Sequence, residues 1–109
     1  MSGLDKRRLR AGNFIKNNGR VLKTINILRY RYNKLSGVQS ALHSEGVSED
    51  EFLDAVNFLA EEGYIELREI ATREIAKLAD IEYEMIEAKV TAKGIRFLAG
   101  GLEDNMIEI

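Results

Sequence analysis

The chain reads SEDEFLDAVNFLAEEGYI from Ser48 to Ile65, which is the pattern of a helix with a defined start and stop that leads into a strand. Ser48 is a candidate N-cap, and Glu51 follows three residues later, at the spacing of a capping box. Gly63 follows the last periodic residue and indicates a C-terminal stop. We therefore predict a helix between Ser48 and Gly63.

This predicted helix has one apolar face and one acidic face. At 100° per residue, the apolar stripe contains Phe52, Val56 and Leu59, with Ala55 and Ala60 at its flanks. The opposite face carries Asp50, Asp54, Asn57 and Glu61. No Lys or Arg occurs between residues 48 and 62. The exposed face of this helix is therefore expected to repel phosphate.

Length and composition exclude several classes of protein. A chain of 109 residues with 45% apolar content fits one domain with a modest core. Because there is no Cys and one His, disulfides, thiolate chemistry and Cys-based zinc sites are excluded, and we predict no metal and no cofactor. No apolar run reaches the roughly 20 residues that span a bilayer, and MSGLDKRRLR lacks a signal-peptide core. We expect a soluble, cytoplasmic protein without a membrane partner.

Charge is distributed unevenly along the sequence. Residues 1–34 hold ten basic side chains against Asp5 alone, a charge of +9, whereas residues 35–109 hold six basic and seventeen acidic groups, a charge of −11. Such asymmetry indicates an electrostatic partner, commonly nucleic acid for the basic segment. The alternative is that the two regions attract each other within the fold or across a dimer.

The N-terminal half is expected to contain two further helices. Residues 1–19 have the character of a basic flexible arm or a weak helix. A helix is predicted over residues 20–33, with an inward stripe of Val21, Ile25, Leu28 and Tyr32. Residues 35–37 break it, and residues 38–44 form a short second helix with Val38, Ala41 and Leu42 inward. Residues 45–47 then make a tight turn.

After Gly63 the apolar period changes from 3.6 to 2, which predicts strands. One strand follows Gly63, and a second covers residues 81–90. In the second strand the apolar residues shift from odd to even positions between Met85 and Ile86, which fits a β-bulge. Residues 71–80 are either a long loop or one or two helical turns starting at Thr72. A last helix begins with Thr91 as N-cap and ends at residues 100–101. Its predicted inward residues are Ile95, Phe97 and Leu98. Residues 102–109 form an acidic tail that frays or packs on a partner.

The predicted fold class is α+β, a winged helix-turn-helix domain over residues 20–101 with three helices, a two-stranded antiparallel wing and a C-terminal helix. The segment GVSEDEFLDAVNFLAEEGYIEL, followed by VTAKGIRFLAGG, resembles the second half of many bacterial and phage winged-helix domains. More narrowly, the chain is similar to the small YjcQ-like winged-helix proteins of bacterial and prophage genomes. The resemblance covers about residues 20–100 and implies a DNA-binding or transcription-regulatory module. The chain departs from DNA-binding members at the recognition helix, where basic and amide side chains are expected.

The basic N-terminal region is therefore the predicted contact with double-stranded DNA. A second stripe on the helix over residues 20–33, opposite the core stripe, combines basic and apolar side chains: Arg20, Lys23, Ile27, Tyr30, Arg31 and Lys34. With the arm, it could track phosphates or enter the minor groove. Three wing residues, Arg68, Arg73 and Lys77, could add contacts to the DNA backbone, although Glu66, Glu69 and Glu74 lie among them. The candidate DNA-binding residues are Arg7, Arg8, Arg10, Arg20, Lys23, Arg31, Lys34, Arg73 and Lys77.

The alternative function is a protein-protein interaction or homodimerisation module that does not bind DNA. Its candidate interface residues are Ile27, Tyr30, Asp50, Asp54, Asn57 and Glu61. An enzyme has less support, because His43 is accompanied by no nucleophile and the glycines lack phosphate-loop spacing. We predict no catalytic residue.

Overall fold

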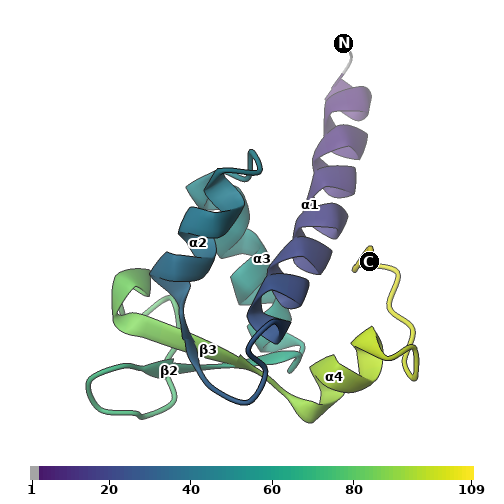
Figure 1. Ribbon diagram of the computed structural model, residues 1–109. Helices are drawn as coiled ribbons and strands as arrows, with labels where there is room; N and C mark the ends of the chain where they lie inside the picture. Colours follow the sequence, from purple (N-terminus) through teal and green to yellow (C-terminus); the bar gives the residue numbers. More distant parts are fainter. Residues whose placement is uncertain (1–2) are drawn as a thin grey trace.

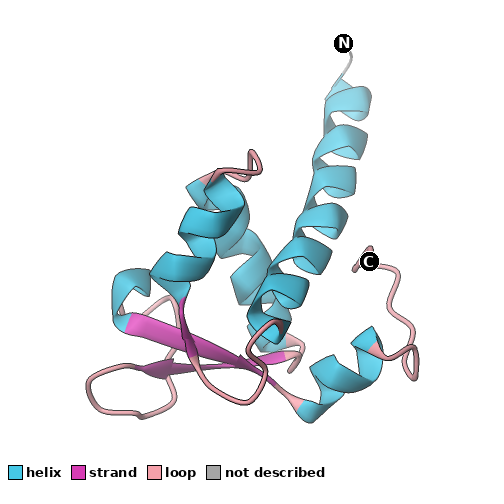
Figure 2. Ribbon diagram, in the orientation of Figure 1, coloured by secondary structure: helices cyan, strands magenta, loops and turns pink. Residues whose placement is uncertain are grey.

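The computed structural model describes the backbone of residues 3–109 and the side chains of residues 12–109. Within this part, the chain forms an α+β fold with four α-helices and a three-stranded antiparallel sheet, which confirms the prediction of a mixed α+β class (Figure 1; Figure 2). The elements are α1 (Gly3–Asn26), β1 (Asn33–Lys34), α2 (Leu35–His43), α3 (Glu49–Glu61), β2 (Ile65–Glu69), a 3-10 turn (Tyr83–Met85), β3 (Ile86–Val90) and α4 (Ala92–Leu98). No helix within residues 3–109 combines the length and apolar character needed to cross a bilayer.

The sheet has β3 at its centre, between β1 and β2. Ile65 pairs with Val90 and Glu69 with Ile86, so the loop between β2 and β3 and the start of α4 lie at opposite ends of the sheet (Figure 1). Two strands were predicted. The third, β1, was missed because its two residues are too few to show an alternating pattern.

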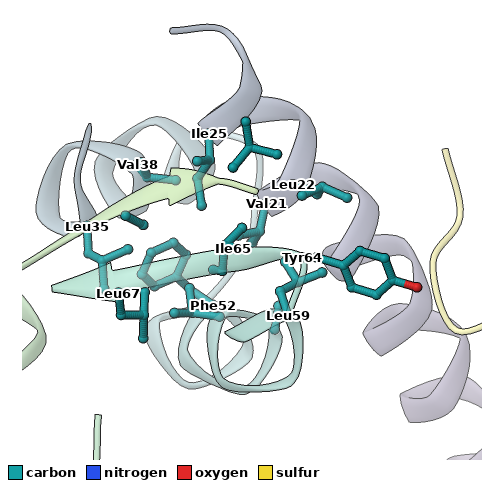
Figure 3. Close-up of a cluster of buried hydrophobic side chains, with 14 of the residues drawn as sticks. Val21, Leu22, Ile25, Leu35, Val38, Phe52, Leu59, Tyr64, Ile65 and Leu67 are labelled. Atoms are coloured by element: carbon teal, nitrogen blue, oxygen red, sulfur yellow. The ribbon is translucent and has the colours of Figure 1, made fainter. Parts of the chain in front are cut away.

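The core lies between one face of the sheet and helices α1, α2 and α3 (Figure 3). Its members on the helices include Val21, Leu22, Ile25, Leu35, Val38, Leu42, Phe52, Val56 and Leu59. The sheet contributes the alternating residues Ile65, Leu67, Ile86, Ala88 and Val90. The other face of the sheet carries charged side chains. This alternation is what a half-covered antiparallel sheet requires.

Helix α3 forms where the sequence predicted it. The Ser48 side chain accepts a hydrogen bond from the Glu51 backbone N–H at 3.2 Å, and the Glu51 carboxylate accepts one from the Ser48 backbone N–H at 3.1 Å. The backbone bond from Ser48 is the main reason that the pKa of Glu51 is lowered. Gly63 takes a φ of 80°, which favours glycine after a helix. The predicted capping box and stop are both confirmed.

The first predicted helix is displaced toward the N-terminus. Helix α1 begins at Gly3 and ends at Asn26, so residues 3–19 follow the helical alternative rather than the flexible arm and continue directly into the predicted helix, whose expected end at residue 33 is wrong. The side-chain amide of Asn33 donates to the backbone oxygens of Leu28 and Arg31, at 3.4 and 3.1 Å, in the chain that follows. These bonds provide partners for carbonyls beyond the helix end. Leu28, predicted in the core, is consequently 49% exposed.

Three further predictions are corrected. Leu35 opens α2 and is fully buried instead of breaking a helix, while Ala41, predicted inward, is exposed. Residues 81–85 are not a strand, because the change of parity at Met85 is the end of a 3-10 turn rather than a β-bulge. Of the two alternatives predicted for residues 71–80, a long loop or one or two helical turns, the structure shows the loop, in which Arg73 has a φ of 61°.

Helix α4 begins as predicted, since the Thr91 side chain accepts from the Gly94 backbone N–H at 3.2 Å. Phe97 is buried and Leu98 half-buried, but Ile95 is exposed and does not face the core. The acidic tail packs on the chain's own α1. Ile107 is buried, and the Glu108 backbone N–H donates to the Ile15 carbonyl at 3.1 Å. The tail therefore extends the core.

Candidate nucleic-acid interface

Two segments of the sequence contain no acidic residue at all. Neither residues 6–44 nor residues 88–102 include Asp or Glu, whereas residues 45–87 hold fourteen acidic side chains and three basic ones. The fold brings the two acid-free segments together, because α1 packs against both α2 and α4 and β1 pairs with β3. One part of the molecule is therefore basic, and α3 with the β2–β3 loop is acidic.

The basic side chains of this region are available to a ligand. Those at Lys16, Arg20, Lys23, Arg29, Arg31 and Lys34 are all exposed. Among the side chains of residues 12–109, the single salt bridge joins Arg68 and Glu87, so none of the six forms an ion pair with another side chain in that range. Two of the six lie near carboxylates: the charge of Arg20 contributes to lowering the pKa of Glu51, and Lys34 is paired across the sheet with Glu87.

The predicted basic stripe is divided between three elements. Arg20 and Lys23 lie on α1, and Lys16, four residues before Arg20, shares their face of the helix. Ile27, Tyr30 and Arg31 follow the end of the helix, and Lys34 belongs to β1, so the prediction of one continuous helical stripe is wrong. The residues Arg7, Arg8 and Arg10 belong to α1 by backbone, and their side chains lie outside those that the structure describes.

Residues 27–32 form a connection that we call the α1–β1 loop. Ile27 is 75% exposed and Tyr30 is 85% exposed, and the Arg29 guanidinium lies 5.3 Å from the centre of the Tyr30 ring. Arg29 also lines a hollow of about 290 Å³ with Ile95 and Leu98 of α4, so loop and helix are neighbours. The loop thus places apolar side chains among the basic groups.

Both ends of the α1–β1 loop are fixed. At its start, Ile25 is buried in the core, and the Asn33 amide reaches back to that residue's carbonyl at 3.5 Å. At its end, Tyr32 donates a hydrogen bond to the Glu66 carboxylate and lies under the Arg68 guanidinium, 3.5 Å from the ring centre. Burial, with the Glu66 hydrogen bond as a second cause, raises the pKa of Tyr32. The loop is a formed structure despite its exposed side chains.

The other candidate residues lie elsewhere. Arg73 and Lys77 are exposed on the β2–β3 loop, at the end of the sheet away from α4, so the fold does not bring them together with the basic residues of α1 (Figure 1). Asp50 and Asp54 line a hollow of about 500 Å³ with Asn13 and Asn17 of α1. The remaining two members of the acidic face, Asn57 and Glu61, line a hollow of about 430 Å³ against the β2–β3 loop. All four are exposed, as predicted for the face of α3 opposite the core.

Sequence reasoning missed the contribution of α4. Lys93 and Arg96 come from the second acid-free segment, and Lys93 donates to the Glu62 carbonyl at 2.7 Å while lying 4.5 Å from the centre of the Tyr64 ring. Arg96 is exposed. The signal for this contribution was the absence of acidic residues over 88–102. In the part of the chain with described side chains, no group of three His, Cys, Asp or Glu residues is placed to hold a metal ion.

Comparisons of the chain with protein-family models, with curated proteins and with solved structures found no match. The function is therefore inferred from the geometry and the charge distribution of this chain.

Proposed function

We propose that the chain is a winged-helix module of bacterial or prophage type that binds double-stranded DNA through the basic residues of α1, including those of its N-terminal turns, in a transcription-regulatory role in the cytoplasm. The order of elements supports this proposal: helix, short strand, two helices, then a hairpin whose second strand lies at the centre of the sheet. In this reading α3 has the position of a recognition helix and the β2–β3 loop that of a wing. Fold analogy supplies the class and no more.

The observation that carries the proposal is the set of exposed basic side chains on α1 and the α1–β1 loop without ion pairs among the described residues. Phosphate contacts by Lys and Arg release condensed counterions from DNA, and this sequence-independent term supplies much of the binding free energy. Basic groups that are already paired with carboxylates would contribute little to the free energy of DNA binding. Lys16, Arg20 and Lys23 share one helix face and are not neutralised in this way.

Helix α3 is not the proposed reader of base edges. Its exposed face presents Asp50, Asp54 and Glu61, with Asn57 as the one amide. Direct readout in the major groove relies mainly on Arg, Lys, Asn and Gln, and the acidic groups would meet phosphate first. We therefore assign α3 a structural role in the complex and no part in reading base edges.

The test compares two charge variants with wild-type protein by fluorescence anisotropy on a mixed pool of short duplexes. Replacing Lys16, Arg20 and Lys23 with Gln should weaken binding by roughly tenfold for each lost phosphate contact at about 50 mM salt. The matched variant Asp54→Asn with Glu61→Gln should bind equally well or more tightly. If wild-type protein shows no binding at low ionic strength, DNA is not the ligand.

A second candidate function is self-association or binding to another protein without DNA. The observation that favours it is the exposure of Ile27 and Tyr30, since large apolar side chains gathered at one surface commonly mark interfaces. Light scattering should then show a dimer, and Ile27→Ser with Tyr30→Ser should convert it to a monomer. Wild-type protein that is already a monomer would remove the homodimer from consideration.

A further inference from the structure

The α1–β1 loop presents apolar surface on both of its sides. Ile27 and Leu28 line a hollow of about 250 Å³ with Gly37 and Val38 of α2, while Arg29 faces the hollow beside α4. Tyr30 projects from the same loop and is 85% exposed. Solvent exposure of three large apolar side chains within four residues is costly unless a ligand covers them.

These side chains are held in place rather than left in a mobile connection. The Arg31 backbone N–H donates to the Leu28 carbonyl at 3.2 Å, closing a turn around Tyr30, and the Asn33 amide donates to the same carbonyl. Tyr32 then fixes the exit of the loop against Arg68. A ligand would therefore meet an ordered loop, and little conformational entropy would be lost on binding.

The charges around the loop select the chemistry of the partner. Lys23, Arg29, Arg31 and Lys34 flank the apolar side chains, and Arg96 extends from the adjacent α4. The nearby carboxylates at the end of the loop are already engaged, Glu66 by the Tyr32 hydroxyl and Glu87 by Arg68. A two-fold dimer through this face would place the same basic patch of each copy against the other, because such an interface is self-complementary. Like charges brought together in this way repel. The partner that fits is anionic and has flat apolar groups between its charges.

We infer that the α1–β1 loop contacts the bases of nucleic acid, with Tyr30 stacked on a base, Ile27 against its neighbour, and Arg29 and Arg31 on the flanking phosphates. This inference rests on the proposed DNA-binding function and adds a base-contacting site to it. Aromatic side chains gain about 1–3 kcal/mol from each base that they stack on. Because inserting a side chain into intact duplex requires unstacking, the loop should favour DNA in which a step is already open.

The test measures binding of wild-type protein to a short continuous duplex, to the same duplex with a two-nucleotide bulge, and to a single strand. The bulged duplex should bind most tightly. Tyr30→Ser and Ile27→Ser should each weaken binding to it by about tenfold, which corresponds to about 1.4 kcal/mol, and should leave the salt dependence unchanged because no charge is lost. Tyr30→Phe should restore binding, since the ring is retained.

The matched control is Ile75→Ser. Ile75 is 69% exposed on the β2–β3 loop, in the acidic part of the molecule, so its replacement removes a similar apolar area without touching the proposed site. Urea unfolding of each variant checks that the fold is kept. The control should bind the bulged duplex like wild-type protein.

Four outcomes would overturn the inference. If the loop variants bind like wild-type protein while the Lys16, Arg20 and Lys23 variant is weakened, the loop is not in contact and the proposed function stands. If wild-type protein binds none of the three nucleic acids, both the base-contacting role of the loop and the proposed DNA-binding function are wrong. A dimer that dissociates on Tyr30→Ser would assign the loop to self-association. Loss of binding to vesicles of anionic phospholipid on Tyr30→Ser, with DNA binding intact, would assign it to a membrane surface.

Discussion

Gly19 lies where the C-terminal tail crosses α1. A Cβ atom at this position would come within 1.7 Å of the backbone oxygen of Glu108, a distance that neither backbone can accept. Next to it, the fully buried Asn18 donates from its side-chain amide to the Met106 carbonyl at 2.9 Å. Gly19 and Asn18 therefore form the surface of α1 on which the C-terminal tail packs. Gly12, earlier on the same helix, has open space where a Cβ atom would lie.

Replacement of these two glycines should therefore have opposite effects. Gly19→Ala should displace the tail and lower the free energy of unfolding by about 1–3 kcal/mol. Gly12→Ala should raise it by about 0.5–1 kcal/mol, because alanine favours the helix and meets nothing. Urea unfolding measures both, and hydrogen exchange at the Glu108 amide reports the tail. If both substitutions stabilised the protein, the C-terminal tail would not pack against α1 at Gly19.

Tyr64 connects the core to the C-terminal tail, and its ionisation at alkaline pH should lower the stability of the fold. Its hydroxyl donates to the Asp104 carboxylate at 2.5 Å, and burial, followed by Asp104, raises the pKa of Tyr64 to about 12 (Figure 3 shows the hydroxyl directed toward the C-terminal segment). An unfolded tyrosine titrates near pH 10. Since the pKa is higher in the folded state, this contribution to stability is complete below about pH 10 and is lost as the pH rises to about 12.

Tyr64→Phe should remove this part of the alkaline loss. At neutral pH the variant should be less stable by about 1 kcal/mol, because the hydrogen bond to Asp104 is lost. Between pH 10 and 12 its free energy of unfolding should fall less steeply than that of wild-type protein. Urea unfolding across this range makes the comparison, and equal slopes for the two proteins would contradict the assignment.

At the scale of elements, the sequence predicts those whose ends carry local signals. Helix α3 has Ser48 and Glu51 at its start and Gly63 just after its end, and α4 has Thr91 as its N-cap. Strand β2 follows directly from the change of period after Gly63. Each of these elements is specified by residues close to it in sequence, and their boundaries were predicted within one or two residues.

The end of α1 was not predictable in this way. Leu28 and Tyr32 continue the helical spacing of Val21 and Ile25, although both lie in the α1–β1 loop. Local spacing alone does not reveal the contacts that hold that loop, such as Arg68 over the Tyr32 ring. The same limit applies to the candidate site. Its α1 basic residues could be identified from sequence, but the fold was needed to bring the α1–β1 loop beside α4.

Asn33 is predicted to hold the α1–β1 loop in its conformation. Asn33→Ala would leave the carbonyls of Leu28 and Arg31 without these partners and should lower the free energy of unfolding by about 1 kcal/mol. Hydrogen exchange should become faster in residues 27–32. Asn57→Ala, on the exposed face of α3, is the matched control and should change stability by less than about 0.5 kcal/mol. Unchanged exchange in the loop would show that Asn33 does not order it.

At the scale of the whole molecule, a net charge of −2 conceals a separation of charge in space. The acid-free segments meet at α1, α2 and α4, while residues 45–87, which include α3 and the β2–β3 loop, hold fourteen of the eighteen acidic side chains. A recognition helix and a wing that contact DNA need positive charge, whereas α3 and the β2–β3 loop are negatively charged. This distribution of charge is the basis for assigning DNA contact to α1 and the α1–β1 loop.

The most direct measurement of this assignment is the slope of log affinity against log salt concentration for a short DNA duplex. Wild-type affinity should fall steeply as salt rises, and the variant with Gln at Lys16, Arg20 and Lys23 should have a slope smaller by about 0.9 for each phosphate contact that it has lost. Neutralising Asp54 and Glu61 should not reduce the slope. Affinity independent of salt, or an unchanged slope in the α1 variant, would contradict the account.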